Sequence, residues 1–412
     1  MTETLAETSA YPTAYPSTYP MARGTCPFDP PPELDRRMHE QPITRVKLWD
    51  GSTPWLLTRY DDVRAMLVDP RVSSNTDLEN FPHPSAGSAA RRQRAKSFIN
   101  MDDPDHAAQR RLLTSDFMVK KVEALRPRIQ EIVDGLIDDM LAGPKLTDLV
   151  QAFALPLPSL VICELLGVPY ADRDFFHRMS KKVIAWDTTA AEALAATDEL
   201  LAYLGGLVER KNAEPTDDVL SRLAVEQLRT GGMTLEQIAS MGQLLLVAGH
   251  ETTANMIALG TVALIEHPEQ LAIVRGTDDP KLIANTVEEL LRYLNIVHSG
   301  RRRVALEDFE IGGQLIRKGE GIIGATDIAN RDETAFPDPD ALDVHRKARH
   351  HVAFGYGVHQ CLGQPLARVE LQVVYSTLYR RVPTLALAVP LEELNFKHDM
   401  LVYGVHELPV TW

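Results

Sequence analysis

Cysteine is scarce in this sequence. Only Cys26, Cys163 and Cys361 occur among 412 residues. An odd and sparse set cannot form a disulfide framework, and it is typical of proteins from a reducing compartment. A zinc site would need more cysteines at fixed spacing. Cys163, inside an apolar stretch, is predicted to be a small buried side chain, whereas Cys26 has no informative context.

Positive charge is in deficit. Lysine and arginine together number 43 against 57 aspartates and glutamates, so the formal net charge is −14. Binding to nucleic acid depends on a basic face that neutralises phosphates. The charge balance therefore argues against nucleic acid as the main partner.

Long apolar runs without a break are also missing. The stretch 149–169 contains Pro156, Pro158 and Glu164, and the stretch 241–265 contains His250 and Glu251 near its middle. A membrane-spanning helix needs about 20 mostly apolar residues, so both stretches are predicted to be buried helices. The N-terminus lacks the apolar centre of a secretory signal. We therefore expect a cytoplasmic protein with no membrane segment.

The remaining pattern is mostly helical with a small β part. Tyr-Pro pairs repeat within residues 1–25, which predicts a flexible tail, and residues 26–412 are expected to form a single domain. Apolar periodicity predicts helices at 60–68, 106–117, 119–142, 149–166, 191–212, 217–229, 234–266, 279–294 and 363–380. Strands are predicted at 44–48 and 55–57, in a Gly-Gly hairpin over 310–316, and within 385–412.

The strongest candidate for a functional motif is the segment 354–363, Phe-Gly-Tyr-Gly-Val-His-Gln-Cys-Leu-Gly. Cys361 ends this glycine-rich loop just before a predicted helix, whose N-terminus should lower the pKa of the thiol. Gly355 and Gly357 permit a tight loop, and Gly363 would let a flat ligand approach. A dinucleotide fingerprint fails because Gln360 stands at its third glycine position. A potassium-filter string fails because no membrane spans accompany it.

A second motif lies in the most apolar predicted helix, at Ala248-Gly249-His250-Glu251-Thr252-Thr253. A zinc-protease motif would need a second histidine at position 254, which is alanine. Glu251 followed by the hydroxyl of Thr252 is instead what a proton relay requires. Because helix distortions often mark active sites, we expect the helix to be widened near Gly249.

Residues 354–363 resemble the cytochrome P450 haem-binding loop, Phe-Gly-x-Gly-x-His-x-Cys-x-Gly, at every fixed position. The motifs occur in family order from about Cys26 to Trp412, and the sequence is most similar to actinobacterial members that hydroxylate vitamin D, sulfonylureas, statins and macrolides. The resemblance implies the cytochrome P450 fold, with haem b held between the long central helix and the helix after the cysteine. It also implies that Cys361 is the axial ligand of the iron, that Thr252 holds dioxygen, and that Glu251 passes solvent protons inward.

Other residues take their expected roles from the same resemblance. Glu289, Arg292 and Arg346 would fix the core behind the haem, as a structural set. The haem itself would be contacted by Ala248, Phe354, Gly355 and Gly363, and its propionates by His106, Arg110, Arg303 and His359, whereas Arg301 and Arg302 have no match. The substrate pocket would be formed by Leu244, Val247, Ala248, Ile296, Val297, His298 and Val402, with the loop 75–100 as a lid. In that loop, Arg91, Arg92 and Arg94 are either solvated surface or a clamp for a substrate carboxylate.

The implied activity is a monooxygenase that inserts one oxygen atom of dioxygen into a C–H bond of an apolar small molecule, such as a steroid or secosteroid, a macrolide, a statin-like compound or a xenobiotic. The sequence holds no nicotinamide or flavin fingerprint, so electrons should come from a ferredoxin and a ferredoxin reductase that uses NADPH or NADH. The basic run 345–351 before the cysteine loop is the expected docking site. A monomer is expected. A haem-thiolate enzyme that does not hydroxylate and a haem sensor are the competing hypotheses.

Overall fold

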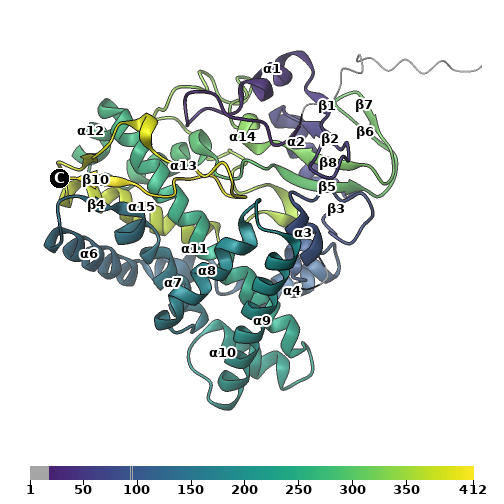
Figure 1. Cartoon of the computed structure of the whole chain (residues 1–412), viewed down its shortest axis with the longest axis horizontal. Coiled ribbons are helices and arrows are strands. Elements are labelled where there is room, and N and C mark those ends of the chain that lie inside the picture. Colours follow the sequence, from purple (N-terminus) through teal and green to yellow (C-terminus); the bar gives the residue numbers. More distant parts are fainter. Residues whose placement is uncertain (1–17, 93, 95) are drawn as a thin grey trace, which may run out of the picture.

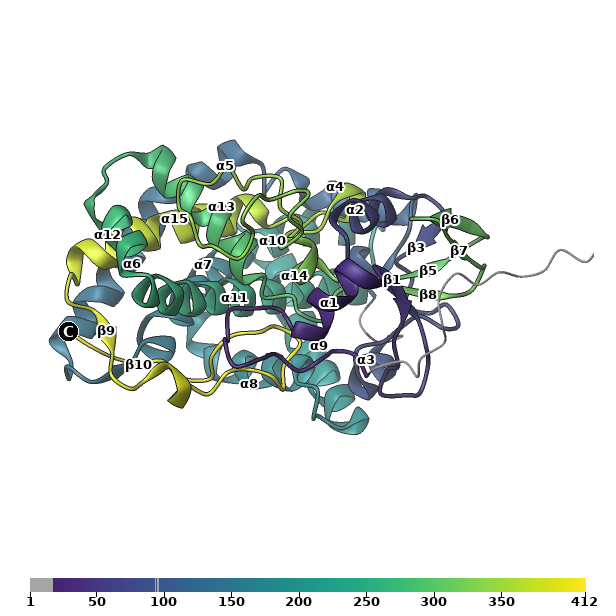
Figure 2. The same cartoon turned by 90° about the horizontal axis from the view of Figure 1, so that it is seen from above.

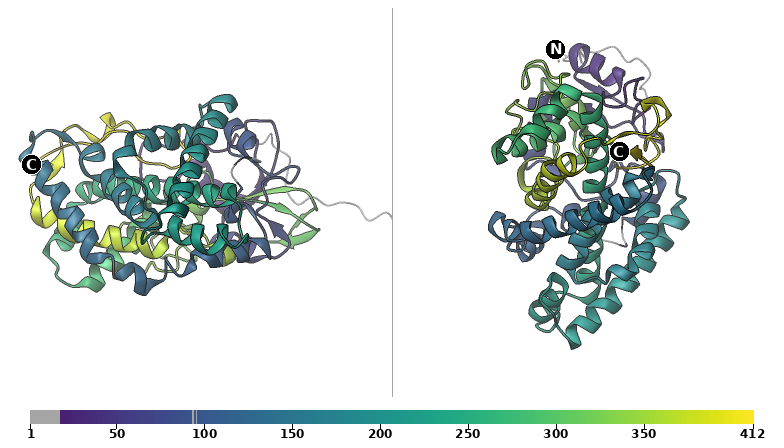
Figure 3. Two further views of the ribbon diagram at one scale, coloured as in Figure 1. Left: turned by 90° about the horizontal axis from the view of Figure 1, so that it is seen from below. Right: turned by 90° about the vertical axis from the view of Figure 1, so that its left-hand side faces the viewer.

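The computed structural model describes residues 18–92, 94 and 96–412 and places a β-sheet at one end of a mostly helical body (Figure 1). The sheet and the C-terminus lie at opposite ends of the molecule (Figure 2, Figure 3). The α-helices are α1 Pro32–Glu40, α2 Tyr60–Val68, α3 Ala86–Arg91, α4 Asp105–Thr114, α5 Val119–Glu123, α6 Arg126–Ala142, α7 Pro156–Leu166, α8 Arg173–Ile184, α9 Ala190–Ala213, α10 Val219–Leu223, α11 Leu235–Glu266, α12 Pro268–Gly276, α13 Pro280–Leu294, α14 Thr326–Ala329 and α15 Gln364–Arg381. The strands are β1 Ile43–Arg45, β2 Trp55–Leu57, β3 Val72–Ser73, β4 Thr147–Asp148, β5 Arg301–Ala305, β6 Phe309–Ile311, β7 Gln314–Ile316, β8 Gly321–Gly324, β9 Ala386–Leu387 and β10 Pro409–Thr411.

The largest sheet has the order β1-β2-β8-β5-β3. Strand β2 pairs with β8 in parallel, and β5 pairs antiparallel with both β8 and β3. Successive side chains of a strand point to opposite faces, so Arg301 and Arg303 of β5 share a face and Arg302 points the other way. This sheet therefore presents two neighbouring cations on one of its sides.

Helix α11 is the 32-residue centre of the body (Figure 2). Thr234 and Gln237 form a capping box at its start, and it ends at Glu266, just before His267-Pro268, because proline cannot donate to a continuing helix. Gly249 lies where α7 crosses, and a Cβ there would come within 2.7 Å of Ile162 Cγ1. The predicted widening near Gly249 is wrong, since α11 is α-helical throughout. The glycine instead permits close packing.

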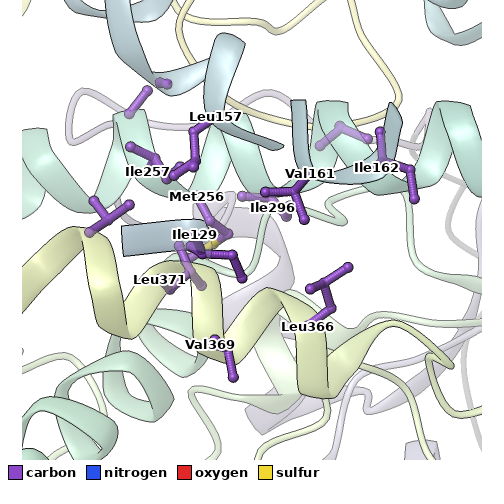
Figure 4. Close-up of a cluster of buried hydrophobic side chains, with 14 of the residues drawn as sticks. Ile129, Leu157, Val161, Ile162, Met256, Ile257, Ile296, Leu366, Val369 and Leu371 are labelled. Carbon is purple, nitrogen blue, oxygen red and sulfur yellow. The ribbon is translucent and has the colours of Figure 1, made fainter. Parts of the chain in front are cut away.

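Part of the hydrophobic core lies where α7, α11 and α15 approach one another (Figure 4). Val161 and Ile162 of α7 reach toward α11, and Leu366 and Leu371 of α15 approach it from the opposite side. Helix α15 is anchored to α11 because the buried hydroxyl of Tyr375 donates to the carbonyl of Met256 at 2.7 Å.

Several predicted elements agree with the structure. The helices at 60–68, 234–266 and 279–294 and the 310–316 hairpin are confirmed within one residue. The predicted helix 119–142 is broken before Pro127, and those at 149–166 and 217–229 contain π-helical turns at Val150–Ala154 and Ala224–Leu228. The predicted strand character of residues 385–412 is wrong for most of that region, since only Ala386–Leu387 (β9) and Pro409–Thr411 (β10) form strands there.

The flexible tail predicted for residues 1–25 can be compared with the structure only from residue 18 onward. Residues 1–17 lie outside the described residues. The expected flexible tail is wrong for residues 18–25, because Tyr19 is 2% exposed and its N–H donates to the carbonyl of Lys47 at 2.8 Å. The guanidinium of Arg23 lies 3.9 Å from the ring centre of Tyr403.

Among the described residues, no single helix is both long and apolar enough to cross a bilayer. Helices α11 and α12 satisfy the length and hydropathy criteria only as a pair, and they are bent by 110° at their junction.

A buried network of ion pairs links α13 to the segment that precedes the cysteine loop. Glu289 and Arg292 form two hydrogen bonds of 2.8 Å, and both side chains are fully buried. Arg346 Nε donates to Glu289 at 3.1 Å. These are the contacts that the resemblance implies for the three residues.

Replacing one partner of this network would leave a buried charge uncompensated. We expect Glu289→Ala to lower the free energy of unfolding by about 3–5 kcal/mol and to yield protein that fails to retain the haem that the resemblance implies. Denaturant unfolding and the haem content after purification measure both effects. Glu131→Ala is the matched control, because the Arg128–Glu131 pair is exposed and should contribute less than about 1 kcal/mol. Equal behaviour of the two variants would contradict the structural role.

Candidate active site

Two adjoining cavities lie beside α11. The inner cavity, of about 290 Å³, lies between α11 and α15 and is lined by Cys361. The outer cavity, of about 470 Å³, extends from α11 to the sheet and to the loop that precedes α4. Leu244, Ala248, Thr252, Val297 and Arg301 line both. The two volumes therefore meet along one face of α11.

The cysteine loop is held by its own backbone. Gly355 and Gly357 have φ angles of 73° and 74°, in the left-handed region that favours glycine. The N–H of Cys361 donates to the carbonyl of Phe354 at 2.9 Å and closes the loop. As a result the thiol faces the inner cavity just before α15 begins.

The pKa of Cys361 differs from the sequence-based expectation. Burial raises it, and this effect outweighs the opposing ones from Arg301, the backbone N–H of Gly363, Arg110 and Arg368. The helix N-terminus does lower the pKa, through the N–H of Gly363, but burial outweighs this lowering in the protein alone. Cys361 would be a thiolate as the ligand of a bound metal ion, because a coordinating thiol is deprotonated.

One face of α15 continues the wall from the cysteine. Gly363, Leu366, Ala367, Glu370 and Leu371 line the inner cavity, at the spacing of one helix face. No atom lies within 4 Å of the position that a Cβ on Gly363 would take. The surface above this residue is therefore open to a flat group.

Glu370 was not identified from the sequence. It is buried, and burial raises its pKa to about 8. Its position seven residues after Gly363 and three after Ala367 is a periodicity that could have identified it.

The predicted acid and alcohol lie on adjacent positions of α11. Thr252 Oγ1 donates to the carbonyl of Ala248 at 2.7 Å and lines both cavities, whereas Glu251 lines only the outer one. Two basic side chains face the carboxylate of Glu251: His250 Nε2 at 3.7 Å and Lys397 Nζ at 3.9 Å. Burial lowers the pKa of both His250 and Lys397. Lys397 has no sequence pattern that could have identified it.

The predicted propionate contacts lie close together. His106 and His359 have ring centres 4.1 Å apart, and Arg110 donates to the carbonyl of Gln360 at 2.6 Å. Arg303 lines the outer cavity beside His359. Burial, together with Arg303, His106 and Arg110, lowers the pKa of His359 to about 3.

Arg301, which the sequence comparison set aside, belongs to the same surroundings. It lines both cavities and donates to the carbonyl of Ala353 at 3.0 Å. Its position two residues before Arg303 on β5 is a period-two pattern that could have identified it.

These residues fit a haem. Within the described part of the chain, Nε2 of His106 and Nε of Arg301 are buried and have no hydrogen-bond partner, so they are available to carboxylates. Apolar side chains of α11 and α15 line the inner cavity, Gly363 leaves room, and Cys361 offers one soft ligand.

Six of the predicted substrate-pocket residues line a cavity. Leu244, Ala248 and Val297 line both cavities, Val247 and Val402 line the outer one, and Ile296 lines the inner one. Of the predicted haem contacts, Gly355 lines the outer cavity, and Phe354 and Gly363 line the inner one.

His298 lines neither cavity, so its prediction as a pocket residue is wrong. Its ring stacks on Trp186 with centres 5.0 Å apart, and its Nε2 lies 2.8 Å from the carbonyl oxygen of Met400. These contacts keep it turned away from the cavities.

The three arginines of the lid loop lie in two different surroundings. Arg91 lines the outer cavity, whereas Arg92 and Arg94 are exposed. Arg92 and Arg94 are therefore solvated surface residues, and Arg91 is not.

Comparison with known proteins agrees with this geometry. Residues 278–382 match the family model for Cytochrome P450. The chain is 55% identical to Cytochrome P450 GfsF of Streptomyces halstedii and 48% identical to Vitamin D3 dihydroxylase of Streptomyces griseolus, covering 95% of each relative and 95% and 94% of this chain. The crystal structure of the mycinamicin VIII C21 methyl hydroxylase MycCI from Micromonospora griseorubida superposes with a TM-score of 0.90 at 40% identity, over 96% of this chain and 100% of that one.

Proposed function

The chain belongs to the cytochrome P450 family of haem-dependent monooxygenases, and from that premise we propose that it hydroxylates a C–H bond of an apolar small molecule held in the outer cavity. The observation that carries the proposal is the meeting of the two cavities at Thr252. One side chain borders both the space in front of Cys361 and the space open to a substrate. A binding protein would not need an acid and an alcohol at that junction.

The residues around the inner cavity would bind the haem. Cys361 would ligate the iron, and Arg110, Arg301, Arg303, His106 and His359 would hold the propionates. When bound, a thiolate-ligated haem supplies the electron donation that favours cleavage of the O–O bond of dioxygen. The protein contributes orientation, water exclusion and proton delivery.

Proton delivery would pass along α11. Glu251 faces the outer cavity between His250 and Lys397, and Thr252 is the next residue. The carboxylate can take a proton on the solvent side and return it near the hydroxyl of Thr252. Held by the carbonyl of Ala248, that hydroxyl presents its lone pairs to the inner cavity.

The names of relatives support a sizeable apolar substrate. One relative is a hydroxylase of vitamin D3, another is named for position 23 of 20-oxo-5-O-mycaminosyltylactone, and a solved structure holds mycinamicin VIII. The outer cavity offers Val183, Ile184, Leu244, Val247, Leu401 and Val402 as apolar walls. We infer a steroid or secosteroid, a macrolide, a statin-like compound or a xenobiotic as the class.

Cys361→Ala is the test of haem ligation. We expect the reduced, carbon-monoxide-bound variant to lose the red-shifted Soret band of a thiolate-ligated haem, because no other described cysteine lines the inner cavity. Cys163→Ala is the control, since that thiol is buried elsewhere in α7 and its loss should leave the band in place. Survival of the band in Cys361→Ala would overturn the assignment.

Thr252→Ala tests the monooxygenase reaction. We expect substrate affinity to be retained, the product formed per NADPH consumed to fall about ten-fold or more, and hydrogen peroxide to accumulate. The reason is that the hydroxyl positions protons near the reacting dioxygen. Product, NADPH and peroxide are measured together with a surrogate ferredoxin and reductase. Thr253→Ala, one residue further along α11, is the matched control, and an unchanged product ratio in Thr252→Ala would assign the task to another group.

An electron donor would dock beside the cysteine loop. Lys347 and Arg349 are exposed just before that loop, whereas Arg346 is tied to Glu289. Val358, three residues before Cys361, is 58% exposed. An acidic ferredoxin would be steered to such cations, because complementary charge raises the encounter rate.

Reversing these charges tests the docking site. We expect Lys347→Glu with Arg349→Glu to slow transfer of the first electron about ten-fold at low salt without changing substrate affinity. The wild-type rate should also fall with added salt, since the screening length shrinks from about 10 Å at 0.1 M to about 3 Å at 1 M. Lys145→Glu with Lys182→Glu reverses two exposed charges elsewhere and should leave the rate unchanged. A salt-independent rate that the first pair does not alter would move the docking site to another face.

A further inference from the structure

The outer cavity has an unexpected charge for an apolar substrate. Among the described residues that line it, Arg91, Arg301, Arg302 and Arg303 are positive and Glu251 is the one carboxylate. Removing a cation from water is costly unless it is paired. Each of these arginines therefore requires a partner, either from the protein or from a ligand.

The three arginines of β5 have partners or a proposed ligand. Arg302 donates to the carbonyls of Pro82 at 2.6 Å and Ser299 at 3.0 Å. Arg301 and Arg303 lie beside the cysteine loop and His359, and the proposed function assigns them to the haem propionates. Arg91 remains.

Arg91, the last residue of α3, has one protein partner. Its Nη2 donates to the carbonyl of Val183 at 2.8 Å. Its Nε is buried without a hydrogen-bond partner, and no carboxylate of residues 18–92, 94 or 96–412 pairs with it. Burial lowers its pKa to about 10, so the guanidinium stays positive at neutral pH. Arg91 as a whole is half-buried, and a half-buried positive charge with one neutral acceptor is an incomplete arrangement.

The location of Arg91 suits one end of an elongated ligand. It lines only the outer cavity, whereas Ala248 and Thr252 line both. Apolar side chains such as Val247 and Ile184 line the same cavity. A molecule with an apolar body could place its reacting carbon at Thr252 and an anionic group at Arg91.

We propose that Arg91 binds the carboxylate of the substrate, so that the enzyme selects apolar carboxylic acids over their neutral esters. The inference rests on the proposed function and narrows its substrate class. The guanidinium fork matches the geometry of a carboxylate. The carboxylate would supply the missing counter-charge.

The test compares acids with their methyl esters. Dissociation constants are measured by equilibrium dialysis for a series of saturated and aryl-substituted fatty acids and for the methyl ester of each. We expect at least one acid of the series to bind the wild-type haem protein about ten-fold or more tightly than its ester, as for a charge-assisted hydrogen bond in a dry site. If no acid in the series binds more tightly than its ester, the proposal is wrong.

Variants at neighbouring positions isolate the charge. Arg91→Gln should abolish the preference for acids while leaving ester affinity within about two-fold, and Arg91→Lys should retain part of it. Arg92→Gln, at the exposed neighbour, should change neither. Equal weakening of acid and ester in Arg91→Gln would mean that Arg91 only ties α3 to α8, and it would overturn the proposal. The carbon-monoxide Soret band reports the proposed function separately, because it depends on Cys361 and not on Arg91.

Discussion

The position of the cysteine depends on the buried guanidinium of Arg292. Besides its two bonds to Glu289, it donates to the carbonyls of Asn330 at 3.0 Å, Pro339 at 2.7 Å and Ala341 at 3.2 Å. A fully buried charge must use its donors, so the segment 330–341 is fixed against α13. Asn330 then accepts the N–H of Val352 at 2.8 Å, two residues before Phe354. The buried ion pair thus helps to fix the position of the cysteine loop through the segment 330–341.

The arginines proposed to hold the haem propionates form no salt bridge within the described part of the protein. Burial lowers the pKa of Arg110, Arg301 and Arg303, because a cation is less stable away from water, and Arg301 lowers that of Arg303 further. His106 is satisfied on one side by Asp103 at 2.9 Å, while its other nitrogen has no described partner. Two carboxylates supplied by a haem would offset this cost. Cofactor binding should therefore contribute to the stability of the folded state.

The sequence could predict the elements whose patterns are local. The helix 234–266 has a capping box, a long apolar run and a terminating proline, and the hairpin at 310–316 has its Gly-Gly turn. The cysteine loop could be identified because its glycines, its thiol and the following helix are contiguous. Long-range pairing could not be predicted, since β5 and β8 form one sheet only through the tertiary fold. For the same reason Lys397 could not be connected with Glu251, nor His298 with Trp186.

One helix serves both cavities because of its periodicity. Leu244, Ala248, Thr252 and Met256 recur every four residues and line the inner cavity, while Ser240, Gln243, Val247 and Glu251 follow an adjacent stripe on the outer one. Successive residues of an α-helix are rotated by about 100°, so Glu251 and Thr252 can face different volumes although they are neighbours in the chain. An acid on the solvent side and an alcohol on the cofactor side are what a relay across the boundary needs. The proposed relay therefore requires no distortion of α11, and the regular helix itself provides the separation.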